Sequence, residues 1–137
     1  MMSQKRPSPA LLSPSISITA PTVRGAGRGG KFLVPTINLD TDNIPSELAH
    51  GIYACWIIVE GKKYKSALHF GPRPVFSDPS PTLEAHLIDT VLTEHPTSAR
   101  VEIIARLRGV ENFSDTAALK AAIDEDIRQT RAILARQ

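Results

Sequence analysis

The clearest indication of the fold is one stretch of sequence, Gly51-Ile52-Tyr53-Ala54-Cys55-Trp56-Ile57-Ile58-Val59-Glu60-Gly61-Lys62-Lys63-Tyr64-Lys65-Ser66-Ala67-Leu68. Residues 52–59 are apolar at every position, which is typical of a strand that is covered on both faces. Gly61-Lys62 then marks a tight turn into a second strand. The stretch therefore predicts a β-hairpin that contains a central strand of a sheet.

Strand-like segments continue on both sides of this hairpin. From Ile16 onward, short segments with a period of two are separated by turn residues. The segments expected as strands are 16–23, 34–39, 51–60, 63–70, 82–89 and 99–108. Short strands at this spacing predict an antiparallel barrel or sandwich.

The pattern changes near the C-terminus. Residues recur at three- and four-residue steps at Leu119, Ile123, Ile127, Thr130 and Leu134. This spacing predicts one amphipathic helix over about 115–136. We expect Ser114 to be its N-cap, and we expect the helix to close one opening of the barrel if a barrel forms.

Composition limits the classes of protein to which the chain can belong. With 137 residues and a formal net charge of +2, the chain has the length of one domain and too little positive charge to wrap nucleic acid. The lone Cys55 is expected to be a buried packing residue in a reducing cytoplasm. No apolar run is long enough to span a bilayer, so we expect no membrane partner.

The N-terminal residues differ in composition from the rest of the chain. Residues 1–15 are rich in Ser and Pro, and we expect them to form a disordered leader that precedes a folded domain over 16–137. The single domain is expected to be a monomer.

A basic, glycine-rich segment lies between the first two expected strands. Its glycines are Gly25, Gly27, Gly29 and Gly30, and its cations are Arg24, Arg28 and Lys31. Backbone N–H groups of such a segment can bind phosphate. The glycine spacing also matches a dinucleotide fingerprint and most of a P-loop, but both motifs require a helix there, which Pro35 disfavours. We therefore interpret the segment as a flap that holds a polyphosphate.

Two neutral oxygen donors follow the flap. Thr36 and Asn38 are two residues apart on an expected strand, so their side chains leave the same face. Such donors suit Mg²⁺ that is completed by water and nucleotide oxygens. The alternative is an ordinary strand end followed by an Asn/Asp turn, and the neighbouring flap is what favours the metal site.

Glu84 is the candidate acid or base. Alternation over 82–89 sends Glu84 and His86 to one face and the apolar residues to the other. A general base must reach the proton that it removes, whereas the alternative is a solvated strand glutamate. The four histidines have no metal-ligand spacing, which argues against zinc bound by histidines. Arg100, Arg106 and Arg108 are expected to share a polar face with Glu102, and such a face is usually solvated surface. Of the three, Arg108 is the candidate for a functional role, because it ends the strand before the loop 109–113.

Several motifs in order resemble the riboflavin kinase family, over about residue 16 to the C-terminus. They are Gly25-Ala26-Gly27-Arg28-Gly29-Gly30-Lys31, Pro35-Thr36-Ile37-Asn38, Gly51-Ile52-Tyr53-Ala54, Phe70-Gly71-Pro72-Arg73-Pro74-Val75-Phe76, Leu83-Glu84-Ala85-His86-Leu87-Ile88-Asp89 and Leu107-Arg108 through Phe113. In bacteria this module is often fused behind an FAD synthetase domain, and the chain resembles a stand-alone kinase. The sequence differs from the family pattern at two places. They are residues 91–98, where the family has an acidic second flap, and Glu111, where a basic residue is common.

The resemblance implies a mainly β fold, a six-stranded antiparallel Greek-key barrel with a C-terminal helix. It also implies transfer of the ATP γ-phosphoryl group to the 5′-hydroxyl of riboflavin, with Mg²⁺, or Zn²⁺ or Mn²⁺, as the metal. The residues that it assigns are Gly25, Gly27, Lys31, Thr36, Leu87 and Asp89 to ATP, Thr36 and Asn38 to the metal, Arg108 and Phe113 to the flavin, and Glu84 to the base.

Two other functions remain open at this point. One is a diverged flavin-binding barrel without efficient kinase activity. The other is a small barrel that binds RNA through its Arg-Gly segment, which requires exposed aromatic side chains. Since Tyr53 and Trp56 lie in the apolar strand, the sequence favours small-molecule substrates over nucleic acid.

Overall fold

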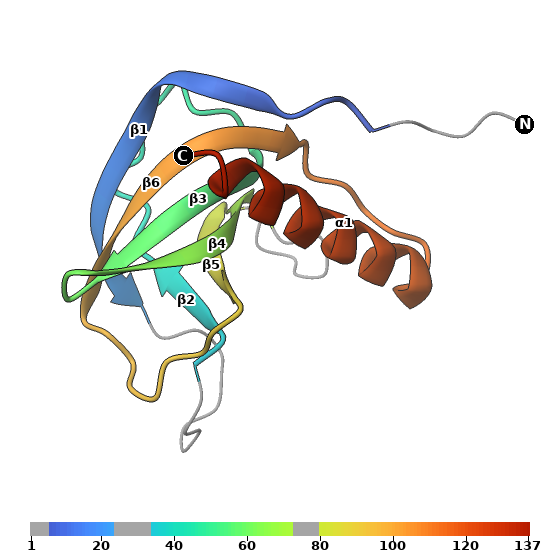
Figure 1. The fold of residues 1–137 in the computed structure, drawn as a ribbon. Helices are drawn as coiled ribbons and strands as arrows, with labels where there is room; N and C mark the ends of the chain where they lie inside the picture. Colours follow the sequence, from blue (N-terminus) through green and yellow to red (C-terminus); the bar gives the residue numbers. More distant parts are fainter. Residues whose placement is uncertain (1–5, 24–33, 73–79) are drawn as a thin grey trace, which may run out of the picture.

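The computed structural model describes residues 6–23, 34–72 and 80–137. Within these ranges, six antiparallel strands form a closed barrel and one helix follows the last strand (Figure 1). The elements are β1 (Ala10–Val23), β2 (Thr36–Leu39), β3 (Gly51–Val59), β4 (Lys62–Gly71), β5 (Thr82–Ile88), β6 (Ser98–Arg108) and α1 (Thr116–Leu134). Around the barrel the order is β1-β2-β5-β4-β3-β6, and β6 pairs with β1 to close the ring. The predicted β fold is confirmed, as a barrel and not a sandwich.

The predicted hairpin is the β3–β4 pair. The two strands are in register from Gly51 opposite Phe70 to Val59 opposite Lys62. The two turn residues between them, Glu60 and Gly61, have φ values of 50° and 81°. Positive φ at both positions is the geometry of a type I′ turn, which matches the twist of the strands that it joins.

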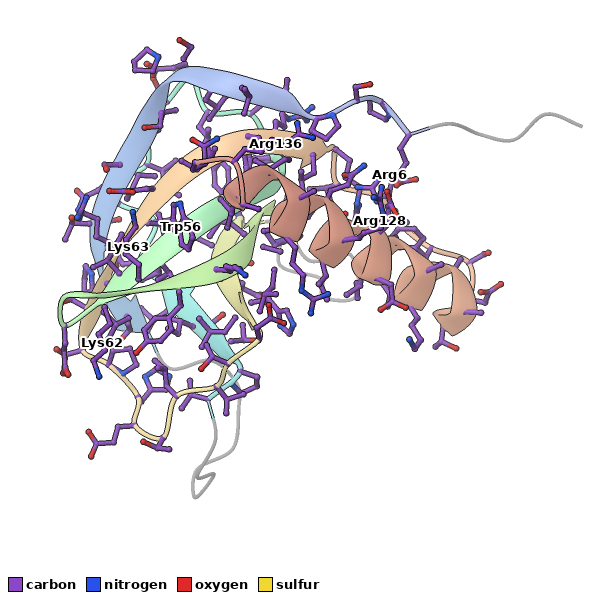
Figure 2. The ribbon with its side chains drawn as sticks, viewed as in Figure 1. Arg6, Trp56, Lys62, Lys63, Arg128 and Arg136 are labelled. Carbon is purple, nitrogen blue, oxygen red and sulfur yellow. The ribbon has the colours of Figure 1, made fainter. Side chains whose placement is uncertain are left out.

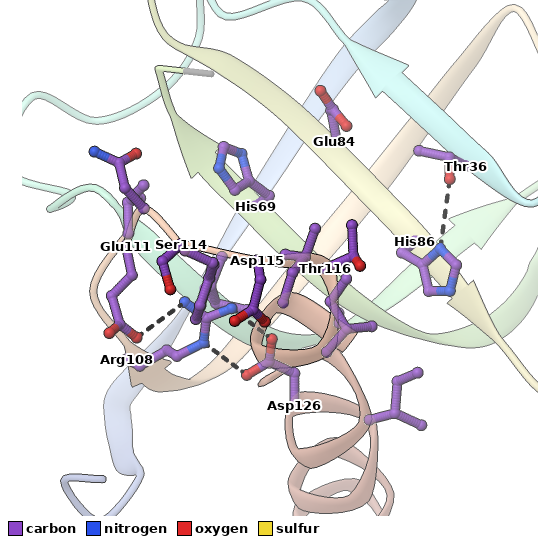
Figure 3. Close-up of a pocket in the computed structure, with 18 residues that line it drawn as sticks. Thr36, His69, Glu84, His86, Arg108, Glu111, Ser114, Asp115, Thr116 and Asp126 are labelled. Atoms are coloured by element: carbon purple, nitrogen blue, oxygen red, sulfur yellow. Dashed lines mark hydrogen bonds and ion pairs between the residues drawn. The ribbon is translucent and has the colours of Figure 1, made fainter. Parts of the chain in front are cut away.

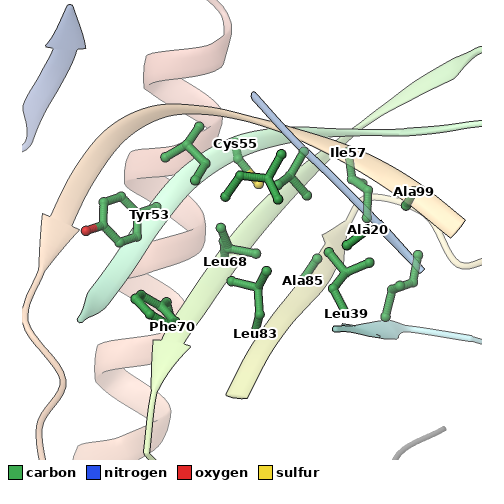
Figure 4. Packing of buried hydrophobic residues seen from close by; sticks show 14 of the residues in the cluster. Ala20, Leu39, Tyr53, Cys55, Ile57, Leu68, Phe70, Leu83, Ala85 and Ala99 are labelled. Carbon is green, nitrogen blue, oxygen red and sulfur yellow. The ribbon is translucent and has the colours of Figure 1, made fainter. Parts of the chain in front are cut away.

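Alternate side chains of the strands fill the interior of the barrel. Tyr53 and Cys55 of β3 point inward and pack with Leu68 of β4 and Leu83 of β5 (Figure 4). Cys55 is fully buried, and burial raises the pKa of its thiol to about 12. The prediction that Cys55 is a packing residue is confirmed.

The outer face of β3 is covered over only part of its length. Ile52 and Ala54 belong to a second apolar cluster, outside the barrel, with Ala105, Leu107 and Ile133. Farther along the strand, Trp56 is partly exposed, and the Lys63 ammonium lies 5.0 Å from the centre of its ring (Figure 2). The central strand is therefore fully covered on both faces only at the end where α1 packs.

The helix lies against the outer wall of the barrel, so the prediction that it closes an opening is wrong. Its side chains reach Ile52 and Ala54, which face away from the barrel interior because β3 alternates inward and outward residues. The prediction of the N-cap is also wrong by one residue, since Asp115 Oδ1 accepts the hydrogen bond from the Ala118 backbone N–H at 2.7 Å. In the part of the chain that the structure describes, no helix is long and apolar enough to cross a membrane.

The first strand begins earlier than expected. β1 starts at Ala10 and not at Ile16, because Ala10 and Leu11 pair with Arg106 and Ala105 of β6. The expected boundary between leader and domain at residue 15 is therefore too late, and the residues from Ala10 onward belong to the barrel.

Candidate active site

Polar side chains meet on the neighbouring strands β2, β5 and β4. Asn38 of β2 is paired with Glu84 of β5, and Glu84 is paired on its other side with His69 of β4. Two residues along β2, Thr36 is paired with His86 of β5. Opposed residues of antiparallel strands project from the same face of the sheet, so these two rows form one polar surface.

The alternation predicted for this region is confirmed. Ile37, Leu83 and Ala85 are at most 1% exposed and point into the core. Glu84 is partly exposed and His86 is exposed on the opposite face. The apolar neighbours therefore hold the strands in place, and the polar residues between them remain accessible.

Short-range polar contacts orient the side chains of this surface. Thr36 Oγ1 lies 3.4 Å from His86 Nδ1, within hydrogen-bond distance. The Thr82 hydroxyl donates a hydrogen bond to Glu84 Oε2 at 3.3 Å. Thr36 of β2 is paired with His86 of the neighbouring strand β5, and Thr82 precedes Glu84 by two residues on β5. The arrangement of the strands therefore sets both contacts.

A cavity of about 770 Å³ opens between the polar surface and the N-terminal part of α1 (Figure 3). Its strand side is lined by Thr36, Ala67, His69, Glu84 and His86. Its other side is lined by Ile52, Arg108, the segment 110–116, and the helix residues Leu119, Ile123, Asp126 and Ile127. A volume of this size, with apolar walls and a few convergent polar groups, is typical of a site for a small organic molecule.

Arg108 lies in the second wall and is buried, with 7% of the residue exposed. Its Nε and Nη2 donate to Asp126 Oδ1 and Oδ2, both at 2.9 Å, and its Nη1 donates to the Gly109 carbonyl at 3.1 Å. The guanidinium carbon is 5.6 Å from the centre of the Phe113 ring. Arg108 is buried and not solvated because α1 packs on the outer face of the barrel, where Arg108 lies opposite Ile52. The register shifts between β3 and β6 instead change the face of Arg106, which is paired with the inward-facing Tyr53.

The apolar stripe of α1 has two parts. At its C-terminal end, Thr130 and Leu134 are buried against the barrel, at 0% and 2% exposed. At its N-terminal end, Leu119 and Ile123 are 41% and 40% exposed and line the cavity. The helix extends past the barrel wall (Figure 1), so the first part of the stripe is available to a ligand.

The structure brings together some of the predicted site residues. Thr36, Glu84, Arg108 and Phe113 all line the cavity. Asn38 is adjacent to it, opposite Glu84. Gly25, Gly27 and Lys31 lie outside the described residues, so their roles stay predictions.

Leu87 and Asp89, predicted to contact ATP, lie apart from this cavity. The Leu87 side chain is part of the barrel core, and its backbone N–H donates to the Pro35 carbonyl at 2.8 Å. Asp89 Oδ1 accepts from Arg131 Nη2 of the helix at 2.6 Å, and Lys65 Nζ is 3.7 Å from Asp89 Oδ2. The hydrogen bond from Arg131 is the main cause that lowers the pKa of the Asp89 carboxyl. The contacts of Leu87 and Asp89 with the nucleotide therefore also stay predictions.

His69 and Asp126 were not singled out from the sequence. His69 alternates with Leu68 and Phe70 on β4, so its face could be inferred, but its partner Glu84 depends on strand order. Asp126 stands among charged helix residues, and nothing in the local pattern separates it from Asp124, which is exposed, or Glu125, which is partly exposed. Only the packing of α1 on the barrel identifies it.

The donor set of this surface suits one kind of metal ion. Among the described residues, no group of three His, Cys, Asp or Glu side chains is placed to hold one. Thr36 and Asn38 instead offer neutral oxygens from one face of β2, beside Glu84. This set fits a hard cation such as Mg²⁺ if most of the negative charge comes from a bound phosphate.

Comparison with known proteins identifies related sequences. The family model Flavokinase, described as riboflavin kinase, matches residues 12–134. Mouse riboflavin kinase is 33% identical over 115 residues, which cover 80% of this chain and 74% of the mouse protein. Human riboflavin kinase is 32% identical over the same length, with the same two shares. The bifunctional riboflavin kinase/FMN adenylyltransferase of Pseudomonas fluorescens is 27% identical over 126 residues, which are 91% of this chain and 40% of that protein.

The fold also recurs among solved structures. A crystal structure of a macrolide-efflux protein from Streptococcus pneumoniae superposes with a TM-score of 0.68 and 21% sequence identity. The match covers 85% of this chain and 38% of that chain. At this level of identity the likeness concerns the barrel and its helix, and it carries no argument about activity.

Proposed function

Because the chain belongs to the riboflavin kinase family, we propose that it transfers the γ-phosphoryl group of ATP to the 5′-hydroxyl of riboflavin, forming FMN and ADP. The observation that carries this proposal is that Thr36 and Glu84 line one wall of a cavity of about 770 Å³, with Asn38 beside it, opposite Glu84. The enzyme is proposed to act as a cytoplasmic monomer.

The flavin is proposed to occupy the space between the strands and α1. Leu119 and Ile123 offer apolar surface to the ring system, and Phe113 offers an aromatic face. Arg108 holds the segment that carries Phe113 through its contacts with Asp126 and Gly109. This arrangement would direct the ribityl chain toward the polar strand wall.

The phosphate side of the site is proposed to consist of the flap and β2. Thr36 and Asn38 would hold Mg²⁺, with Zn²⁺ or Mn²⁺ as alternatives, and Gly25, Gly27 and Lys31 would bind the ATP phosphates, with Leu87 and Asp89 contacting the nucleotide. When bound, the cation neutralises charge on the phosphate oxygens. Positioning and charge neutralisation supply most of the rate enhancement in phosphoryl transfer, so these residues should dominate turnover.

Glu84 is proposed to be the general base. Its carboxylate would take the proton of the ribityl 5′-hydroxyl as that oxygen forms a bond to the γ-phosphorus. The bond between the γ-phosphorus and the bridging oxygen then breaks, and the electron pair leaves with ADP. The Thr82 hydroxyl, which donates to Glu84 Oε2, would orient the carboxylate for this step.

The direct test is formation of FMN. The protein is incubated with riboflavin, ATP and Mg²⁺, and the flavins are separated by chromatography. We expect FMN from the wild type and a loss of turnover of about a hundredfold or more in Glu84→Gln, the usual contribution of a general base. The matched control is Glu102→Gln, a strand glutamate ion-paired with Arg100 on the outer face, which should retain full activity.

Two outcomes would contradict the proposal. Full activity in Glu84→Gln would remove the role of the base. Tight binding of riboflavin without any FMN would indicate a flavin-binding barrel that does not transfer phosphate.

A further inference from the structure

Arg6 lies upstream of residues 12–134, the part of the chain that matches the family model, yet its side chain contacts the helix. Arg6 Nη2 donates a hydrogen bond to Asp126 Oδ1 at 2.7 Å, across 120 residues of sequence. Figure 2 shows Arg6 beside α1, near Arg128. The segment before β1 is thus joined to the helix that forms part of the cavity.

The Asp126 carboxylate is shared between two guanidinium groups. Oδ1 accepts from Arg6 Nη2 and from Arg108 Nε, and Oδ2 accepts from Arg108 Nη2. The side chain of Asp126 is 6% exposed, that of Arg108 is 8% exposed, and that of Arg6 is 24% exposed. Arg6 adds a third charge-assisted hydrogen bond to a carboxylate that Arg108 already holds with two. Its contribution is to restrict where the carboxylate and its partner lie.

The position of Arg108 in turn affects residues 109–115, which form one wall of the cavity. Its Nη1 donates to the Gly109 carbonyl at 3.1 Å and is 3.7 Å from Glu111 Oε1, and its guanidinium carbon is 5.6 Å from the centre of the Phe113 ring. Residues 109–114 belong to neither a strand nor the helix, and Asp115 is joined to α1 as its N-cap. The side chain of Arg108 is therefore a principal support of this wall (Figure 3).

We propose that Arg6 is a positioning residue of the cavity: it holds the Asp126 carboxylate, which fixes Arg108 and thereby the 109–115 wall against which the ligand packs. The identity of that ligand as riboflavin rests on the proposed function. The positioning itself is a property of the protein without ligand, and can be measured separately.

The experiment compares Arg6→Gln, Arg6→Lys and Arg128→Gln with the wild type. Lysine keeps one charged donor for Asp126, whereas glutamine does not. Arg128 is an exposed arginine on the same helix, ion-paired with Glu125, and its substitution controls for loss of one positive charge. Two quantities are measured: hydrogen exchange of the 109–115 amides without ligand, and the Kd for riboflavin from quenching of its fluorescence.

For Arg6→Gln we expect faster exchange in 109–115, with exchange in β3 and β4 unchanged, and a Kd for riboflavin raised about threefold to tenfold, the scale of a partly exposed charge pair. The KM for ATP should stay within twofold of the wild-type value. Arg6→Lys should behave nearly as the wild type in both the exchange rate of 109–115 and the Kd for riboflavin. Arg128→Gln should match the wild type in both.

Other outcomes would overturn the inference. Unchanged exchange in 109–115 for Arg6→Gln, or the same change in Arg128→Gln, shows that Arg6 does not position this wall. Faster exchange throughout the barrel, with ATP and riboflavin affected equally, shows a merely structural role. If the wild type binds no riboflavin, the proposed function fails, and the exchange measurement alone still decides whether Arg6 positions the wall.

Discussion

The cavity has a strand wall, formed by β2, β4 and β5, and a helix wall, formed by residues 108–116 and α1, and the two are held in place differently. In the strand wall, Asn38, Glu84 and His69 are aligned by backbone pairing. In the helix wall, the position of Arg108 depends on its side-chain bonds to Asp126. Substitutions in the strand wall should therefore alter chemistry more than stability, whereas loss of the ion pair in the helix wall should alter stability first.

The largest expected effect is that of Asp126→Ala on stability. Removing this carboxylate leaves the Arg108 guanidinium buried without its charged partner, which should lower the free energy of unfolding by about 3–5 kcal/mol. Urea unfolding followed by circular dichroism measures it. Asp124→Ala, which removes an exposed helix carboxylate paired with Lys120, is the matched control and should change little. Equal, small effects in both variants would show that the buried pair does not support the helix wall.

The second effect is that of Asn38→Ala on turnover. The side chain is proposed to hold the metal ion, and charge neutralisation is expected to matter most in phosphoryl transfer, so kcat should fall about a hundredfold or more and at least as far as in Glu84→Gln. The unfolding free energy should change little, because the backbone pairing of β2 with β5 remains. Steady-state formation of FMN measures kcat, with Asn43→Ala as the control. A fall in the unfolding free energy with unchanged kcat would contradict the expectation that substitutions in the strand wall alter chemistry more than stability.

The smallest effect concerns Asp89, which joins the end of β5 to the helix through Arg131. This hydrogen bond lowers the pKa of Asp89 in the folded protein, so its stabilising contribution is present above the unfolded pKa of about 3.9 and is lost as pH falls through the lower folded value. Asp89→Asn should lower Tm slightly at neutral pH. The difference from the wild type should shrink as the pH falls below about 4 and should disappear below the folded pKa.

Asparagine is a suitable replacement because Asp89 has a φ of 67°, a left-handed conformation that asparagine tolerates. Arg131→Gln should have the same effect, and the double variant should lose no more than either single variant. A difference in Tm that persists at low pH would mean that Asp89 acts through its shape and not through its charge.

The strands and the face of each catalytic candidate were predictable because they follow from a local rule. In β5, alternation alone separates Glu84 and His86 from the buried Leu83 and Ala85, and the structure confirms it. The same rule misplaces Arg106, because the register shifts between β3 and β6 pair it with the inward-facing Tyr53, and such shifts leave no clear local pattern.

The helix shows the other limit of prediction from sequence. The spacing of Leu119, Ile123 and Leu134 predicts one apolar stripe, but the structure divides it between barrel packing and the cavity. Periodicity records that a face avoids water, and it does not record whether protein or ligand covers that face. The exposed half of the stripe is identified only once the helix is docked on the barrel.

The sequence by itself determined the elements, the inward faces of the strands and the order of the family motifs, because these depend on residues near one another in the chain. Only the tertiary structure decided that Asn38, Glu84 and His69 form one row, that α1 lies on the outer wall, and that Arg6, Arg108 and Asp126 meet. These contacts join residues that are distant in sequence. Their formation depends on strand order and on desolvation of charge in the folded chain, which no local pattern encodes.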